Sequence, residues 1–179
     1  MGSSNSEETG DRIQETEEKT LLIQSMTTTE ARIDSQTITK LGPKEYAAMH
    51  ALEKAIKESG LDRKLIELIK VRVSQINGCA FCLNMHTAGA RAAGWTDREL
   101  HLLPAWRETP SFTASERAVL DFAEHVTRIS EQHVPAPVYN ALRESFTEEQ
   151  TLHLTWAVIA INSWNRLMIT FTVPPAEEK

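Results

Sequence analysis

Apolar residues recur at intervals of three and four from Pro43 onward, the spacing that places them on one side of an α-helix. Pro43 suits the first position of a helix and Gly60 suits the residue that follows one, so the first apolar stripe predicts a helix between them. That stripe consists of Tyr46, Met49, Leu52 and Ile56. A second apolar stripe predicts a helix over residues 62–75, and Asn77-Gly78 ends it.

Three threonines mark the starts of further helices. Thr96, Thr113 and Thr147 are each followed three residues later by Glu or Gln, which is the capping-box pattern. Two more helices are predicted over residues 79–94 and 135–146. No segment shows the alternation typical of β-strands, so the sequence predicts an all-α fold of six or seven helices.

The last predicted helix, over residues 148–171, is apolar on most sides, which indicates a central or interfacial position. The helical pattern as a whole predicts one domain over residues 36–173. Residues 1–35 are polar and acidic and predict a flexible extension, whose Met-Gly-Ser-Ser opening is similar to a leader added for expression. After Pro174-Pro175 we expect a short C-terminal tail over residues 174–179.

Composition narrows the classes of partner. The chain has 179 residues and a net charge of −6, and six acidic against two basic residues in the first twenty account for −4 of it. The negative net charge argues against nucleic acid as a partner, because binding it requires a cationic surface. The remainder of the chain is close to neutral. The longest apolar run, Trp156 to Ile161, is six residues, too short to span a membrane. With no secretory signal visible, we expect a cytoplasmic protein.

The only two cysteines, Cys79 and Cys82, lie three positions apart, and His86 follows four positions after the second. On one helix these side chains share a face, and the N-terminus of a helix favours a thiolate. Two thiols one turn apart can close a disulfide, and a histidine can carry a proton near neutral pH. Two alternatives stay open, namely buried structural cysteines and a zinc site on these three residues.

The segment from Glu67 to His86 resembles the AhpD-like alkylhydroperoxidase group of the carboxymuconolactone decarboxylase family. The shared pattern is a glutamate on the preceding helix, then Cys-x-x-Cys, then a histidine four residues later. The segments 74–79 and 162–167 also resemble single-domain members, and the resemblance covers about residues 36–172. It implies an all-helical fold that assembles as a homotrimer or a homohexamer.

The resemblance further implies an antioxidant peroxidase without a cofactor or metal. Cys82 would be the peroxidatic cysteine and Cys79 the resolving one, with Glu67 and His86 as the proton relay. The substrate would be a hydroperoxide, and a dithiol donor such as a lipoyl-type protein would reduce the disulfide again. The sequence departs from the pattern at Phe81, where peroxidases of this group carry a second histidine.

Without the resemblance, the residues around Glu67 in the sequence predict a surface position for it and not a place in a proton relay. It shares a polar stripe with Arg63, Lys64 and Lys70, which favours a solvent-exposed, salt-bridging residue. We expect Trp164, Asn165 and their neighbours on the last helix to serve packing and subunit contacts. Two further functions stay open, a lyase like the decarboxylases that name the family, which needs no cysteine pair, and a non-enzymatic oligomeric redox sensor.

Overall fold

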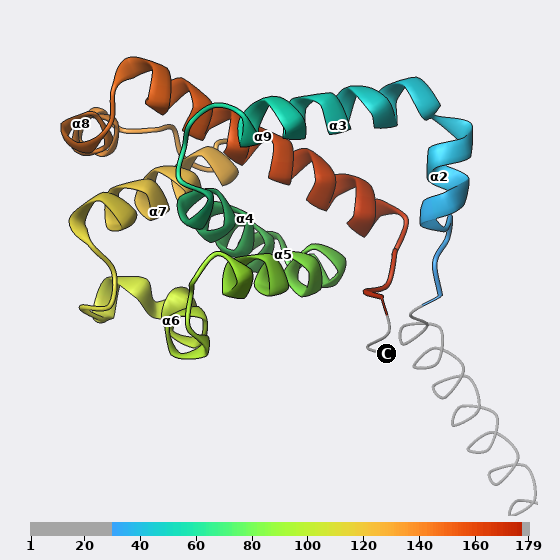
Figure 1. The fold of residues 1–179 in the computed structure, drawn as a ribbon, viewed down its shortest axis with the longest axis horizontal. Coiled ribbons are helices and arrows are strands. Elements are labelled where there is room, and N and C mark those ends of the chain that lie inside the picture. The colour runs from blue at the N-terminus through green and yellow to red at the C-terminus, as the bar shows by residue number, and fades with distance from the viewer. Residues whose placement is uncertain (1–29, 177–179) are drawn as a thin grey trace, which may run out of the picture. The chain divides into compact units, whose positions relative to one another are not determined.

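The computed structural model describes residues 30–176, and these contain helices and no strand (Figure 1). The α-helices are α2 (Ser35–Leu41), α3 (Pro43–Lys57), α4 (Arg63–Asn77), α5 (Ala80–Ala92), α6 (Asp97–Leu102), α7 (Ala114–Thr127), α8 (Ala136–Ser145) and α9 (Glu148–Thr170). A 3₁₀-helix, η1 (Leu103–Glu108), follows α6. The predicted all-α class is confirmed.

The three helix starts predicted from capping boxes are confirmed. Thr96, Thr113 and Thr147 cap α6, α7 and α9. In each case the threonine side chain accepts the backbone N–H three residues on, and the threonine backbone N–H donates to the side chain of that Glu or Gln. α2 and η1 are additional to the six or seven helices expected. α2 was missed because it is only seven residues long and buries none of them.

The predicted extension over residues 1–35 lies mostly outside the described residues, as does the end of the predicted tail over 174–179. Within the described part, α2 begins at Ser35, and the Arg32 backbone N–H donates to the carbonyl oxygen of Phe171 at 2.9 Å. No helix among residues 30–176 is both long enough and apolar enough to cross a membrane.

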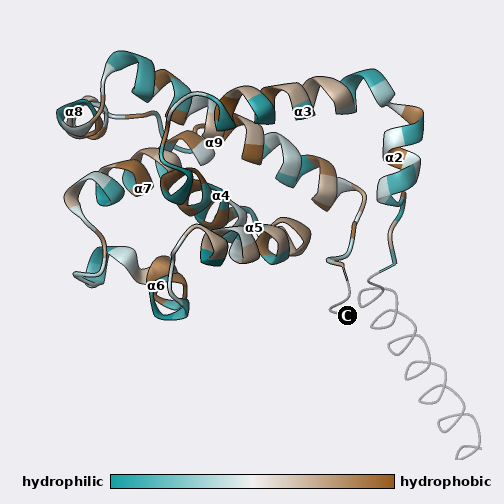
Figure 2. Ribbon diagram, viewed as in Figure 1, coloured by the Kyte–Doolittle hydropathy of each residue, from teal (hydrophilic) through white to brown (hydrophobic). Residues whose placement is uncertain are grey.

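α4 lies at the centre of the fold and packs against α5, α7 and α9 (Figure 1). α9 also packs along α3. α3 and α7 alternate between hydrophobic and hydrophilic positions along their length, as helices with one buried side do (Figure 2). α4 instead is buried on most of its circumference, so even Glu67 and Lys70 are only 8% and 2% exposed. The surface position expected for Glu67 from its polar stripe was therefore wrong.

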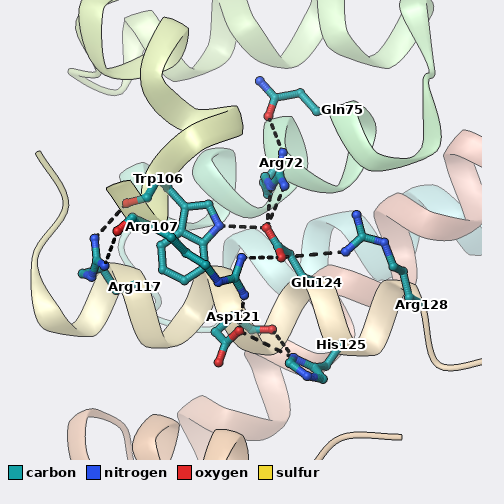
Figure 3. Close-up of polar contacts among 9 residues, drawn as sticks. All are labelled: Arg72, Gln75, Trp106, Arg107, Arg117, Asp121, Glu124, His125 and Arg128. Atoms are coloured by element: carbon teal, nitrogen blue, oxygen red, sulfur yellow. Dashed lines mark hydrogen bonds and ion pairs between the residues drawn. The ribbon is translucent and has the colours of Figure 1, made fainter. Parts of the chain in front are cut away.

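A buried carboxylate joins α4 to α7 and η1 (Figure 3). Glu124 of α7 accepts hydrogen bonds from Arg72 of α4 at 2.8 Å, and from Trp106 and Arg107 of η1 at 2.7 Å each. Burial alone would raise the pKa of Glu124, but these three donors hold it below the ordinary value. The cluster fixes the outer side of α4, opposite the side that carries the residues described next.

Candidate active site

The turn between α4 and α5 places the two cysteines. Gly78 ends α4 in the left-handed region, with a φ of 71° that a residue with a side chain rarely adopts. Cys79 is then the N-cap of α5, and its Sγ accepts the backbone N–H of Cys82 at 3.4 Å. Both cysteines are free thiols and only 1% exposed. We expected Cys79 within the first turn, and it lies one residue before that turn.

Glu67 of α4 and His86 of α5 face each other across the contact between these helices. Their Oε2 and Nδ1 atoms are 3.0 Å apart, and both side chains are about nine-tenths buried. Gly89 lies beside this pair, and a Cβ there would be 2.9 Å from Glu67 Oε2. Glycine at this position therefore leaves the room that the glutamate occupies.

A cavity of about 310 Å³ opens beside Cys82. Its wall comes from α2, α3, α4, α5 and α9, and it includes the Glu67–His86 pair as well as Cys82. The remaining lining residues are Ser35, Tyr46, His50, Glu53, Lys57, Lys70, Phe81, Met85, Gly89, Trp164 and Met168. Cys79 does not line the cavity, so a molecule bound there meets Cys82 and not Cys79.

The two thiols titrate as a pair. A hydrogen bond from the Cys82 side chain, with further bonds from the backbone of Cys82 and Phe81, lowers the pKa of Cys79 to about 7. The same bond to Cys79, together with burial, raises the pKa of Cys82 above its ordinary value. The pair therefore releases one proton near neutral pH and retains the second between the two sulfur atoms.

Glu67 stays ionised despite its burial. Burial would raise the pKa of this carboxyl group, but the hydrogen bond and charge of His86 and the charges of Lys70 and Arg63 hold it below the ordinary value. An ionised carboxylate only accepts hydrogen bonds, so the imidazole must donate from Nδ1. In the neutral form of His86, Nε2 is then left as the proton acceptor.

Asn165 is a site residue that the sequence analysis assigned to packing. It is fully buried, and its side-chain hydrogen bonds help to lower the pKa of both Cys79 and Cys82. Its Oδ1 accepts from Asn77 Nδ2 at 2.8 Å, and its Nδ2 donates to Ser74 Oγ at 3.1 Å. The signal for it was a pair of amides, Asn162 and Asn165, within the largely apolar second half of α9.

An aromatic wall was also missed. Tyr46, His50 and Trp164 pack against one another in the cavity wall, with ring centroids 4.6 to 5.4 Å apart. Tyr46 and His50 come from α3 and Trp164 from α9, so no local pattern connects them. Phe81, next to Cys82, adds a further apolar side chain to the lining. Among residues 30–176, no three His, Cys, Asp or Glu side chains are grouped to hold a metal ion.

These features define an all-helical protein with a Cys-x-x-Cys pair, a buried Glu–His pair and a cavity. Residues 39–125 match the carboxymuconolactone decarboxylase family. A structure of ATU0492 from Agrobacterium tumefaciens, a protein of unknown function suggested to be the antioxidant defence protein AhpD, is 38% identical. It covers 83% of this chain and 100% of that one, with a TM-score of 0.79. The chain belongs to the carboxymuconolactone decarboxylase family, with an AhpD-like core.

Other relatives extend this result. The uncharacterized protein YdfG of Bacillus subtilis is 42% identical over 130 residues, which are 73% of this chain and 88% of that protein. The debrominase Bmp8 is 16% identical, with a TM-score of 0.66 over 77% of this chain and 74% of that one. At that identity Bmp8 shares the fold alone. The fold therefore accommodates more than one reaction, so the reaction of this chain has to be inferred from the residues of its site.

Proposed function

We propose that this protein is a thiol peroxidase that reduces hydroperoxides through Cys82 and Cys79. The observation that carries the proposal is that Cys82 lines a cavity together with the Glu67–His86 pair, while Cys79 lies one turn away behind it. The family and the suggested antioxidant role of ATU0492 support an enzyme of this general kind.

The first step needs a thiolate on Cys82. The pair carries one negative charge near neutral pH, and movement of the shared proton from Cys82 to Cys79 brings that charge to the cavity. A neutral His86 would be a second acceptor, taking the Cys82 proton at Nε2 through a water molecule, with the ionised Glu67 stabilising the imidazolium that forms.

The proposed reaction then has three steps. The Cys82 thiolate attacks the outer oxygen of the hydroperoxide, the O–O bond breaks, and the alkoxide takes a proton and leaves as an alcohol. The Cys79 sulfur attacks the resulting sulfenic acid, which forms a disulfide and releases water. A dithiol donor, for which we propose a lipoyl-type protein, reduces the disulfide and is itself oxidised.

Two broader proposals accompany this function. We propose a cytoplasmic location, where the reducing environment would keep the pair as thiols between turnovers. We also propose a homotrimer or homohexamer of the 36–173 domain, because α9 leaves Leu152, Trp156 and Ile159 exposed on one side. Sedimentation equilibrium of the full chain tests the assembly, and a monomeric mass would exclude it.

The test of function is hydroperoxide consumption with a dithiol reductant. We expect turnover by the wild type and loss of at least about a hundredfold in Cys82→Ser, since no other thiol lines the cavity. Cys79→Ser should still form the sulfenic acid but no intramolecular disulfide, so its turnover should fall and depend on direct attack by the dithiol on the sulfenic acid. Turnover by Cys82→Ser at the wild-type rate would exclude the mechanism. Disulfide formation without turnover would identify a redox sensor, and an activity that survives alkylation of both thiols would favour the lyase.

A further inference from the structure

Lys70 is a buried cation in the wall of the cavity. Its side chain is 2% exposed, and it pairs with Glu53, whose side chain is 12% exposed. Lys70 belongs to α4 and Glu53 to α3, so the pair bridges two helices beside the site. Burying an ion pair costs desolvation energy, and apolar residues of similar size are often at least as stable. A contribution to stability alone therefore does not explain this pair.

The position of Lys70 relates it to the candidate relay. It follows Glu67 by three residues on α4, so the two side chains lie one turn apart on the same side of the helix, and both line the cavity. The charge of Lys70 contributes to the low pKa of Glu67, and Glu53 is the carboxylate that pairs with Lys70. Lys70 therefore acts on Glu67, and Glu53 acts on Lys70.

The other charged groups around Glu67 are few. His86 of α5 is its hydrogen-bond partner, and Arg63 of α4 is an exposed cation one turn away. From α3, the exposed residues His50 and Lys57 line the same cavity. α9 contributes only uncharged lining residues, Trp164 and Met168, and α2 only Ser35.

We propose that Lys70, the buried ion-pair partner of Glu53, is a positioning residue whose ammonium group keeps Glu67 ionised and so keeps His86 ready to accept the proton of Cys82. The proposal rests on the proposed role of Cys82 as the reacting thiol. An ionised Glu67 accepts the Nδ1 hydrogen of His86, which directs the free lone pair of Nε2 away from Glu67. Protonation of Glu67 would remove the negative charge that stabilises the imidazolium and would weaken the acceptor for the Nδ1 hydrogen.

The test measures the reactivity of Cys82 and not peroxide turnover. In the Cys79→Ser background the chain has a single thiol, and its alkylation by iodoacetamide is followed against pH over the range in which the protein stays folded. Lys70→Met should move the acid side of the profile to higher pH, with a rate about tenfold lower there. Glu53→Gln should move it to lower pH, since it removes only the negative partner.

A matched control uses another cation of the same helix. Arg63→Gln removes one positive charge one turn from Glu67, but Arg63 is exposed and solvent screens it, so its shift should be much smaller. Shifts in opposite directions for Lys70→Met and Glu53→Gln support the proposal. Shifts in the same direction for both variants would overturn it. If the ion pair only stabilised the structure, the direction of the shift would not depend on whether the positive or the negative partner was removed.

Two further variants cover the case in which a lone buried charge prevents folding. The double variant Lys70→Met/Glu53→Gln leaves no unpaired charge and should fold, with its profile still moved to higher pH. An unchanged profile in the folded double variant would overturn the proposal. In the Glu67→Gln background, Lys70→Met should give no further shift, and an undiminished shift would show that Lys70 does not act through Glu67.

These readouts also separate the proposal from the proposed function. If the wild type consumes no hydroperoxide but the alkylation profiles shift as expected, the peroxidase is excluded and the role of Lys70 is retained. If turnover is found and the profiles do not move, the role of Lys70 fails and the peroxidase stands.

Discussion

Gly89 faces the carboxylate of Glu67 across the contact between α4 and α5. Because the two residues are so close, a substitution at Gly89 tests the role of the Glu67–His86 pair. In Gly89→Ala the new Cβ would lie 2.9 Å from Glu67 Oε2, so the carboxylate has to move away from His86. Because a carboxylate at the end of a side chain moves easily, we expect the protein to fold. Alanine also gains about 0.5–1 kcal/mol over glycine inside a helix.

Gly89→Ala should therefore keep or raise the melting temperature while hydroperoxide turnover falls about tenfold. Ala88→Gly is the reverse exchange at the neighbouring, exposed position, and it should lower stability without lowering turnover. Thermal melts and turnover measured on both variants give the comparison. Full turnover in Gly89→Ala would mean that the position of Glu67 does not matter for the reaction.

Some single residues could be recognised as candidates from the sequence, and others could not. Cys79, Cys82 and His86 stood out because sulfur and imidazole side chains at helical spacing suggest chemistry on their own. Glu67 was predictable only through the family resemblance, since its polar neighbours suggested a surface position. Glu67 is buried because other helices surround α4. A local sequence pattern carries no information about that packing.

At the scale of helices, the contact of α4 with α7 depends on one buried carboxylate. Glu124→Gln removes the charge that pairs with Arg72, and the Arg72 side chain is only 11% exposed. Since breaking a buried pair leaves an uncompensated charge, we expect a loss of about 3 kcal/mol in the free energy of unfolding. Asp121→Asn, which removes the partly exposed partner of Arg107, should cost less than about 1 kcal/mol.

The loss should depend on pH in a defined direction. The pKa of Glu124 is lowered in the folded state, so its stabilisation is complete above the pKa of the unfolded chain and is lost as pH falls through the folded value. The difference in stability between wild type and Glu124→Gln should therefore shrink on acidification. Urea titrations at several pH values measure this, and a difference that grows on acidification would contradict the assignment.

Helix boundaries were the most predictable part of the fold. A cap is a local arrangement of a few residues, so Thr96, Thr113 and Thr147 could be recognised without any knowledge of packing. α2 and η1 were not recognised. Both are short, and neither shows the long apolar periodicity from which helices are predicted.

At the scale of the whole molecule, the cavity is the feature that the sequence could not provide. Its wall combines the four consecutive helices α2 to α5 with α9 from the other end of the domain. The aromatic group of Tyr46, His50 and Trp164 and the ion pair of Lys70 with Glu53 exist only after these helices pack. The residues proposed to carry the chemistry could be named from the sequence, but the cavity that Cys82 lines could not.

The position of Cys82 in this wall leads to the most direct test of the central claim, that Cys82 is the sulfur a hydroperoxide oxidises. Cys79→Ser is treated with one equivalent of an organic hydroperoxide in the presence of a sulfenic-acid trap, and the labelled residue is identified by peptide mass spectrometry. We predict the label on Cys82, and a disulfide between Cys79 and Cys82 in the wild type treated alike. An unlabelled Cys82, with the hydroperoxide nonetheless consumed, would contradict the mechanism.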